Sequence, residues 1–228
     1  MRIESLFDQQ TQQIKIAVDC IIFGFNNNRL ECLLIHREAE PQKGKWSLIG
    51  GFIGNDEDLD EAANRVLYNL SGLENVYMEQ VKAFGKANRD PRGRTISITY
   101  TALILRSEYD DDKIKDHGAK WFPVNDLPEL AFDHIDMVEA AIIRLRRRVR
   151  NTPIALNLIP EKFTIPQLQA LYEGILDEPL DKRNFRRKIA QIEAIVKLGE
   201  KDMTASRRGA FLYAFDENLY NNTQYFNL

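Results

Sequence analysis

The segment formed by residues 164–189 constrains the fold of this chain more than any other stretch. Thr164 and Gln167 have the spacing of a capping box, which predicts the start of a helix. Apolar residues then recur at helical spacing, at Leu168, Leu171, Tyr172, Ile175 and Leu176. After a short turn, Asp181 is placed to cap a second helix over residues 182–189. Two helices joined by such a turn predict a helix-turn-helix.

The second of these helices is strongly cationic, because five of the seven residues 182–188 are Lys or Arg. Its apolar residues are expected to form one buried stripe, made of Phe185, Ile189 and Ile192. At about 100° per residue, Arg183 and Arg187 point away from this stripe, and Asn184 borders them. Arg can bond a guanine edge and Asn an adenine edge, so these residue types suit the major groove of DNA. A solvated cationic helix is the alternative interpretation.

Two strands are expected after this helix. They span residues 195–198 and 210–215, and the loop between them is basic, which completes the pattern of a winged helix. The residues expected to contact double-stranded DNA are Thr164, Lys182, Arg183, Asn184, Arg186, Arg187, Lys188, Lys201, Arg207 and Arg208. Of these, Arg183, Asn184 and Arg187 are assigned to base edges. The residues assigned mainly to phosphates are Lys182, Arg186, Lys188, Arg207 and Arg208.

Charge divides the chain in two. Residues 1–143 hold 16 Lys or Arg and 24 Asp or Glu, a balance of −8, whereas residues 144–228 hold 15 and 10, a balance of +5. Such a division is typical of two units with different partners, and the basic unit is the one that suits nucleic acid. We expect domains over residues 1–150 and 151–228.

The acidic part has the patterns of an α/β domain. The strands expected from apolar and alternating runs span residues 14–25, 30–36, 46–53, 76–86 and 95–106. Asn26 to Asn28 predict a hairpin between the first two strands, and Asp110 to Asp112 predict a solvated turn. Helices are expected over residues 59–70, where Gly72 stops the pattern, and over residues 135–150.

The last of these helices would connect the two domains. Its apolar residues recur every three or four positions, at Ile135, Val138, Ile142, Leu145 and Val149. This stripe can pack on its own domain or on a second subunit. A single recognition helix reads only a few base pairs, so we expect a homodimer on a palindromic operator.

Several functional classes are excluded or disfavoured by the sequence. No apolar run approaches the ~18 residues that span a bilayer, and the charged N-terminus does not resemble a signal peptide, so we expect a cytoplasmic protein without membrane contact. Cys20 and Cys32 lie in apolar runs, where small buried hydrophobes are expected. The three histidines lack metal-ligand spacing, and no P-loop or nucleophile elbow occurs. We expect no cofactor and no metal.

The glycine pair Gly50-Gly51 before an acidic loop and a helix resembles the Nudix hydrolase signature. The residues in register with that signature are Gly51, Glu57, Arg65, Leu67, Gly72 and Leu73. Where the signature places glutamates, this chain has Val66, Asn69 and Leu70. In active Nudix enzymes those glutamates hold Mg²⁺ or Mn²⁺. The resemblance therefore implies a Nudix-like fold without hydrolase activity, and an active nucleotide diphosphatase is the alternative.

Taken whole, the chain resembles the NrtR type of Nudix-related transcriptional regulators. The segments that resemble this family most are Pro153 to Thr164, Leu168 to Tyr172, Pro179 to Lys188 and Leu212-Tyr213. The resemblance implies an α+β protein, in which an N-terminal Nudix-like α/β/α sandwich with a mixed sheet precedes a C-terminal winged helix-turn-helix. It also implies a DNA-binding regulator, which we expect to be a repressor released from its operator by an effector. A module that binds an acidic protein through its basic helix is a third hypothesis.

The effector remains open between two classes that the family senses. ADP-ribose needs a cleft with cationic partners for its pyrophosphate, whereas a free pentose needs polar side chains and an aromatic platform. We favour a pentose such as L-arabinose, and hence control of carbohydrate utilisation, because the likeness is closest to that branch. The candidate lining residues are Arg37, Trp46, Gly50, Gly51, Arg89, Arg92 and Arg94. Trp46 could instead be a core residue, and the arginine loop could serve only solvent.

Overall fold

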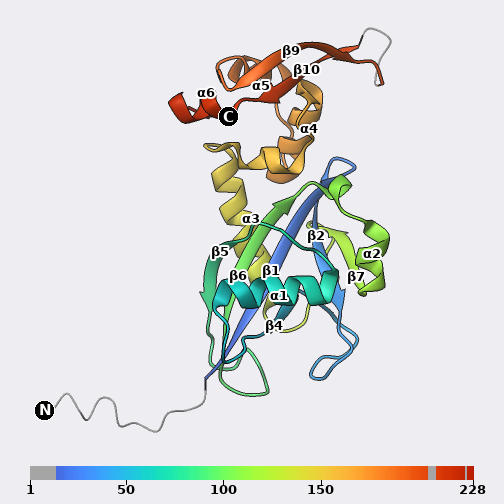
Figure 1. Ribbon diagram of the computed structural model, residues 1–228, viewed down its shortest axis with the longest axis vertical. Helices are drawn as coiled ribbons and strands as arrows, with labels where there is room; N and C mark the ends of the chain where they lie inside the picture. Colours follow the sequence, from blue (N-terminus) through green and yellow to red (C-terminus); the bar gives the residue numbers. More distant parts are fainter. Residues whose placement is uncertain (1–13, 205–208, 224) are drawn as a thin grey trace, which may run out of the picture.

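The computed structural model describes residues 14–204, 209–223 and 225–228. A large mixed sheet forms the N-terminal part, with α1 (Leu59–Ser71) on one face and α3 (His134–Val149) on the other (Figure 1). A small three-stranded sheet and the helices α4 (Ile165–Leu176) and α5 (Lys182–Ile189) form the C-terminal part. This arrangement confirms the predicted α+β fold, with a sandwich followed by a winged helix-turn-helix. Within the described residues, no helix is long and apolar enough to cross a membrane.

The large sheet is built around β1. Its strands are β1 (Lys15–Asn26), β2 (Arg29–His36), β3 (Trp46–Ser47), β4 (Ile49–Phe52), β5 (Glu79–Phe84), β6 (Thr95–Ile104) and β7 (Ala119–Pro123). β1 pairs in parallel with β6 and antiparallel with β2 and β4. β5 extends the sheet beyond β6, and β3 and β7 both pair with β2. Asn27 and Asn28 have positive φ angles of 47° and 59°, so the predicted hairpin between β1 and β2 is confirmed.

Alternate residues of β1 face opposite layers of the sandwich. Val18, Cys20 and Ile22 pack in the cluster beneath α1, whereas Ile21 and Phe23 pack in the cluster beneath α3. Cys20 and Cys32 are both buried and free, as their apolar surroundings predicted. Burial raises the pKa of the Cys32 thiol to about 12, so this side chain behaves as a small hydrophobe.

Several short elements of the N-terminal part and its connection differ from the sequence prediction. The expected turn at Asp110 to Asp112 was wrong, because Asp110 accepts N–H bonds from Asp112 and Lys113 and caps the helix α2 (Asp111–Asp116). β7 was not predicted, nor was β8 (Phe163–Thr164). These strands are five and two residues long, so their pairing partners rather than their own sequences define them.

The C-terminal part has the order of a winged helix. β8 pairs with β10 (Ala210–Phe215), and β10 pairs with β9 (Ile195–Asp202). The predicted capping box is present, because Thr164 Oγ1 accepts the Gln167 N–H at 3.3 Å and the Gln167 side chain accepts the Thr164 N–H. A helix that the sequence analysis did not identify, α6 (Glu217–Thr223), follows β10.

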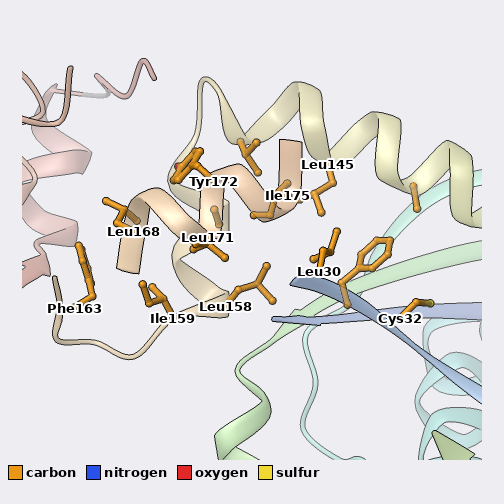
Figure 2. Close-up of a cluster of buried hydrophobic side chains, with 14 of the residues drawn as sticks. Leu30, Cys32, Leu145, Leu158, Ile159, Phe163, Leu168, Leu171, Tyr172 and Ile175 are labelled. Atoms are coloured by element: carbon orange, nitrogen blue, oxygen red, sulfur yellow. The ribbon is translucent and has the colours of Figure 1, made fainter. Parts of the chain in front are cut away.

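One hydrophobic core joins the two parts of the chain. Leu145 of α3 packs in the same cluster as Leu30 of β2, Leu158 of the 3₁₀ helix Pro153–Leu158 and Leu171 of α4 (Figure 2). The β1–β2 hairpin also touches α4 directly. A Cβ atom at Gly174 would lie 2.7 Å from the Phe25 ring and 2.9 Å from the Asn28 carbonyl oxygen, so glycine permits this close approach.

Candidate ligand site and nucleic-acid interface

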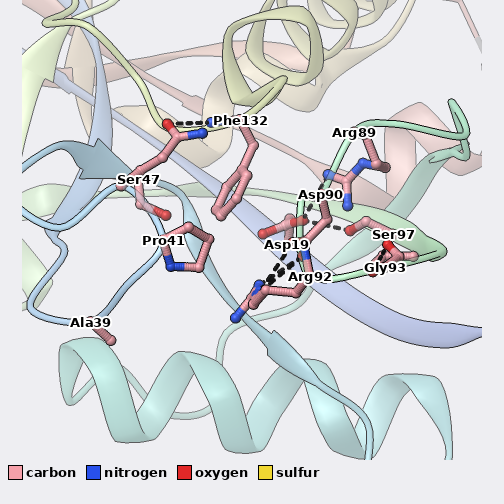
Figure 3. A network of polar contacts seen from close by, with 12 residues as sticks. Asp19, Ala39, Pro41, Ser47, Arg89, Asp90, Arg92, Gly93, Ser97 and Phe132 are labelled. Atoms are coloured by element: carbon pink, nitrogen blue, oxygen red, sulfur yellow. Dashed lines mark hydrogen bonds and ion pairs between the residues drawn. The ribbon is translucent and has the colours of Figure 1, made fainter.

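A cluster of buried polar side chains lies where the sheet meets the N-terminus of α3 (Figure 3). Asp19 of β1 is 5% exposed and accepts a hydrogen bond from Ser97 Oγ at 2.5 Å. Arg89 Nη2 lies 3.8 Å from Asp19 Oδ2 and donates to Asp133 Oδ1 at 2.7 Å. A charge this deeply buried must be paired, because its desolvation is costly. Asp19 therefore has its partners within the cluster.

His134, the first residue of α3, belongs to the same cluster. The Leu48 N–H donates to His134 Nδ1 at 3.1 Å, which assigns the ring proton to Nε2. Nε2 lies 3.6 Å from Asp19 Oδ1. Burial lowers the pKa of His134 more than the Asp19 carboxylate raises it, so the imidazole is neutral at neutral pH. A neutral ring thus attaches the start of α3 to the sheet.

Two guanidinium groups converge on the ring of Phe132. The Cζ atoms of Arg37 and Arg92 lie 4.9 Å and 5.7 Å from its centroid. Arg92 is paired with Asp90, whereas the Arg37 guanidinium donates to the Pro41 carbonyl oxygen at 3.1 Å. Burial and, next, the charge of Arg92 lower the pKa of Arg37. Two guanidinium groups thus lie beside one aromatic ring, and one of them is paired with a carboxylate.

Phe132 itself has a positive φ of 53°, in the left-handed region that a bulky residue rarely adopts. Such backbone strain is found mainly at functional sites, where the surrounding structure holds it. Gly50 closes the cluster from β4. A Cβ atom there would lie 2.0 Å from Asp19 Oδ1, so only glycine lets this strand pass the carboxylate.

The cationic helix α5 has the geometry that its sequence predicts. Phe185, Ile189 and Ile192 are buried, and Arg183 and Arg187 are exposed on the opposite side. Asp181 caps the helix by accepting the Asn184 N–H at 2.7 Å. Because the face opposite the stripe is exposed over its whole length, it can enter a groove.

The other predicted DNA contacts differ in their surroundings. Lys182 and Arg186 are exposed, whereas Lys188 is half-buried and lines a small pocket with Leu180 and Tyr172. Thr164 is 4% exposed and its side chain caps α4, so the structure gives it a structural role in place of a DNA contact. On the wing, the ammonium group of the predicted Lys201 lies 4.8 Å from the Phe211 ring centroid, and that of Lys197, which was not predicted, lies 3.5 Å from it. Arg207 and Arg208 lie outside the described residues.

Sequence comparison agrees with this two-part architecture. Residues 13–141 match the family described as NUDIX domain, and residues 155–215 match the NrtR DNA-binding winged helix domain. The "ADPR responsive transcriptional repressor NtrR" of Acinetobacter baylyi is 36% identical over 204 residues, which cover 88% of this chain and 81% of that relative. The chain belongs to the NrtR-like family of Nudix-domain transcriptional regulators.

Solved structures of NrtR from Shewanella oneidensis are similar to this chain. NrtR complexed with a 27mer DNA superposes with a TM-score of 0.79 at 31% identity, covering 93% of this chain and 97% of that one. The NUDIX domain of the same protein complexed with ADP ribose has a TM-score of 0.52 at 30% identity, covering 64% of this chain and 99% of that one. The family is thus the predicted one, and its sugar-sensing branch is not shown by these relatives.

The acidic side chains in the segment that resembles the Nudix signature are bonded within the protein. Arg65 Nε donates to Glu57 Oε2 at 2.8 Å, and the bonds from Arg65 and from the Gly54 N–H lower the pKa of Glu57 to about 2. Glu61 completes the capping box of α1 by accepting the Asp58 N–H. Leu70 packs against the core beneath α1. In the part of the chain that the structure describes, no three acidic, His or Cys side chains are grouped as they would be to hold a metal ion.

The predicted ligand residues of this NrtR-like chain lie in different places. Arg37, Gly50 and Arg92 lie in the polar cluster, Arg89 forms its buried ion pairs, and Gly51 packs toward Val66 of α1. Arg94 Nη1 donates to the Gly85 carbonyl oxygen and so holds its own loop. Trp46 packs edge-on against His36 and Phe122, which favours the core interpretation.

Sequence reasoning missed most of the cluster that surrounds the predicted arginines, including Asp19, Phe132 and His134. Asp19 is the single charged residue in the apolar run from Ile16 to Phe25, and this interruption is a signal that could have identified it. Phe132 lies in an irregular segment just before α3, and His134 is the first residue of that helix, so no spacing pattern marks either of them. Their role depends on where the chain places the start of α3.

Proposed function

We propose that this chain is a transcriptional repressor, which binds double-stranded DNA through its winged helix and releases it when a small molecule occupies the cluster around Asp19. The exposed arginine face of α5 supports the first part of this proposal. The likeness to NrtR complexed with DNA supports it over nearly the whole chain. We also propose a homodimer and a domain division at residues 150 and 151, as the sequence suggested.

ADP-ribose is the effector that we propose. The observation that carries this choice is the convergence of the Arg37 and Arg92 guanidinium groups on the Phe132 ring, because paired guanidinium groups suit a pyrophosphate. The Asp19 carboxylate beside them can accept hydrogen bonds from ribose hydroxyl groups. The relative of Acinetobacter baylyi is named as ADPR-responsive, and the related NUDIX domain is complexed with ADP ribose. These relatives do not support the pentose that the sequence analysis favoured.

A pentose is the second candidate, and one observation favours it. The carboxylates of the cluster neutralise most of its cations, because Arg89 pairs with Asp133 and Arg92 pairs with Asp90. A site with this charge balance suits a neutral sugar, whose hydroxyl groups bond carboxylates and guanidinium groups alike. The two candidates differ in the pyrophosphate, which only ADP-ribose would place beside the guanidinium groups.

Calorimetry on the full chain with ADP-ribose and with L-arabinose tests the choice. We expect saturable binding of ADP-ribose, and loss of one charged hydrogen bond in Arg37→Gln should weaken it about tenfold or more. Lys43→Gln, an exposed change in the same loop, is the matched control and should bind normally. If the chain binds L-arabinose but not ADP-ribose, and Arg37→Gln weakens that binding, the pentose replaces ADP-ribose as the proposed effector. Binding of neither compound would contradict the assignment of this cluster as the effector site.

A further inference from the structure

A cavity lies far from the Asp19 cluster, at the junction of the two parts of the chain. Its volume is about 500 Å³, within the range of small-molecule pockets. Strands β5 and β6 form one wall, and α3 together with the 3₁₀ helix Pro153–Leu158 forms the other. Arg144 on this wall is ten residues along α3 from His134, which corresponds to about 15 Å.

Most of the cavity wall is apolar. Leu103 of β6 and Ile154 and Leu156 of the 3₁₀ helix are only half-buried, although each packs against the shared core. A ligand that covers this apolar wall gains free energy of binding, because the covered surface is removed from water. The wall therefore suits the hydrocarbon part of a ligand.

One end of the cavity is polar and has free hydrogen-bonding capacity. Thr101 Oγ1 and Arg144 Nε are buried and have no hydrogen-bond partner among the described residues. Arg144 and Arg148 both approach the single carboxylate of Glu79, which pairs opposite Thr101 in the sheet. Two guanidinium groups thus share one anion. Buried polar groups without partners are rare in proteins, so a bound group that supplies an acceptor would satisfy this end.

We propose that this junction cavity is a second ligand site, which binds an amphipathic carboxylate with its head at Arg144 and Thr101 and its hydrocarbon part against Leu103, Ile154 and Leu156. The site is separate from the effector cluster around Asp19. Its walls come from the sheet, from α3 and from the segment that leads to the winged helix. An occupant therefore contacts both parts of the chain.

Octanoate is the probe, titrated by calorimetry into the full chain without DNA. We expect saturable binding of octanoate, with acetate and octan-1-ol each binding much more weakly because each lacks one half of the recognised chemistry. Arg144→Gln should weaken octanoate binding about tenfold, because it removes a charged hydrogen bond. Arg147→Gln, on the exposed face of the same helix, is the matched control and should bind octanoate as the unchanged chain does.

Leu103→Trp provides an independent test, since the larger ring fills the apolar part of the cavity and should abolish binding. Circular dichroism and retained ADP-ribose binding establish that each variant is folded. The proposal is overturned if octanoate does not bind, which includes the case in which a second copy of the chain covers the cavity. Equal affinity in Arg144→Gln, or equal affinity for octan-1-ol, also overturns it.

Discussion

Asp19 is the residue whose placement says most about the ligand domain. It lies in the middle of β1, between the buried Val18 and Cys20, where an apolar residue would pack without cost. An unpaired carboxylate at this depth would be strongly destabilising, but Ser97, Arg89 and His134 surround it. A buried ion pair is weak support for stability, because apolar replacements often stabilise a fold as well. The polar cluster is therefore not required for folding, which agrees with the recognition role that we propose for it.

The pH dependence of stability should report the neutral His134. Burial lowers its pKa below the ordinary value of about 6.5, so the unfolded chain binds a proton that the folded chain does not. This contribution is complete above about pH 6.5 and is lost as the pH falls toward the lower pKa of the folded state. Urea unfolding between roughly pH 7.5 and pH 5 should show it, and His134→Gln should flatten the dependence.

Lys43→Gln, an exposed change that leaves His134 in place, should keep the full pH dependence of the unchanged chain. If His134→Gln and the unchanged chain lose stability equally on acidification, the imidazole is not the titrating group.

The second prediction at the scale of residues is that the chain does not hydrolyse ADP-ribose. By the resemblance to the Nudix signature, we expect Asn69 and Leu70 to take the places of metal-binding glutamates, and Leu70 packs against the core. With Mg²⁺ or Mn²⁺ added, we expect no appreciable hydrolysis of ADP-ribose, measured as metal-dependent product release. Turnover that disappears on chelation and is lost in Glu57→Gln would instead identify a displaced metal at the Arg65–Glu57 pair.

At the scale of elements, α5 carries the DNA prediction. Arg183→Ala and Arg187→Ala should each cost about 1–3 kcal/mol of specific binding and relax one operator position, because each removes a contact to a base edge. In the structure Arg187 donates to Asn184 Oδ1 at 2.7 Å, so these two residues assigned to base edges are already in contact. Titration of operator and of random duplex with fluorescence anisotropy provides the measurement.

Lys182→Ala is the matched comparison on the same helix. Its exposed ammonium group is assigned to a phosphate, so its loss should weaken operator and random duplex alike and reduce the salt dependence. Equal losses on both duplexes for Arg183→Ala and Arg187→Ala would refute the assignment to base edges.

Elements with their own start and stop signals could be predicted from the sequence. The capping box at Thr164, the cap at Asp181 and the stop at Gly72 all occur in the structure, because each signal acts within one turn of a helix. β7 and β8 could not be predicted, since each is defined by a partner strand distant in sequence. The same reason hid the ligand cluster, whose members His134 and Asp19 meet only after the sheet has formed.

At the scale of the whole molecule, α3 is part of a core that crosses the proposed domain division. Val138, Leu145 and Val149 of the predicted stripe are buried in their own chain, whereas Ile135 is 41% exposed. Ile143, which the stripe did not include, is 69% exposed. The stripe therefore packs mainly within the subunit, and the exposed isoleucines of α3 are the ones free to contact a second copy. Because His134 and Leu145 belong to one helix, we propose that a shift at the Asp19 cluster reaches the winged helix through this packed core.

The last prediction follows from this continuity. If the effector favours the arrangement of the free protein, operator DNA must weaken effector binding by the same factor by which the effector weakens DNA binding, since linkage is reciprocal. Couplings of this kind are typically about 5–150-fold. Calorimetry with ADP-ribose, in the presence and absence of saturating operator, measures this factor directly. Gly174→Val, which would force the β1–β2 hairpin away from α4, should reduce the coupling while leaving ADP-ribose affinity without DNA unchanged. Unchanged effector affinity on the operator would show that the two sites are uncoupled, and a monomer bound to DNA would contradict the expected dimer.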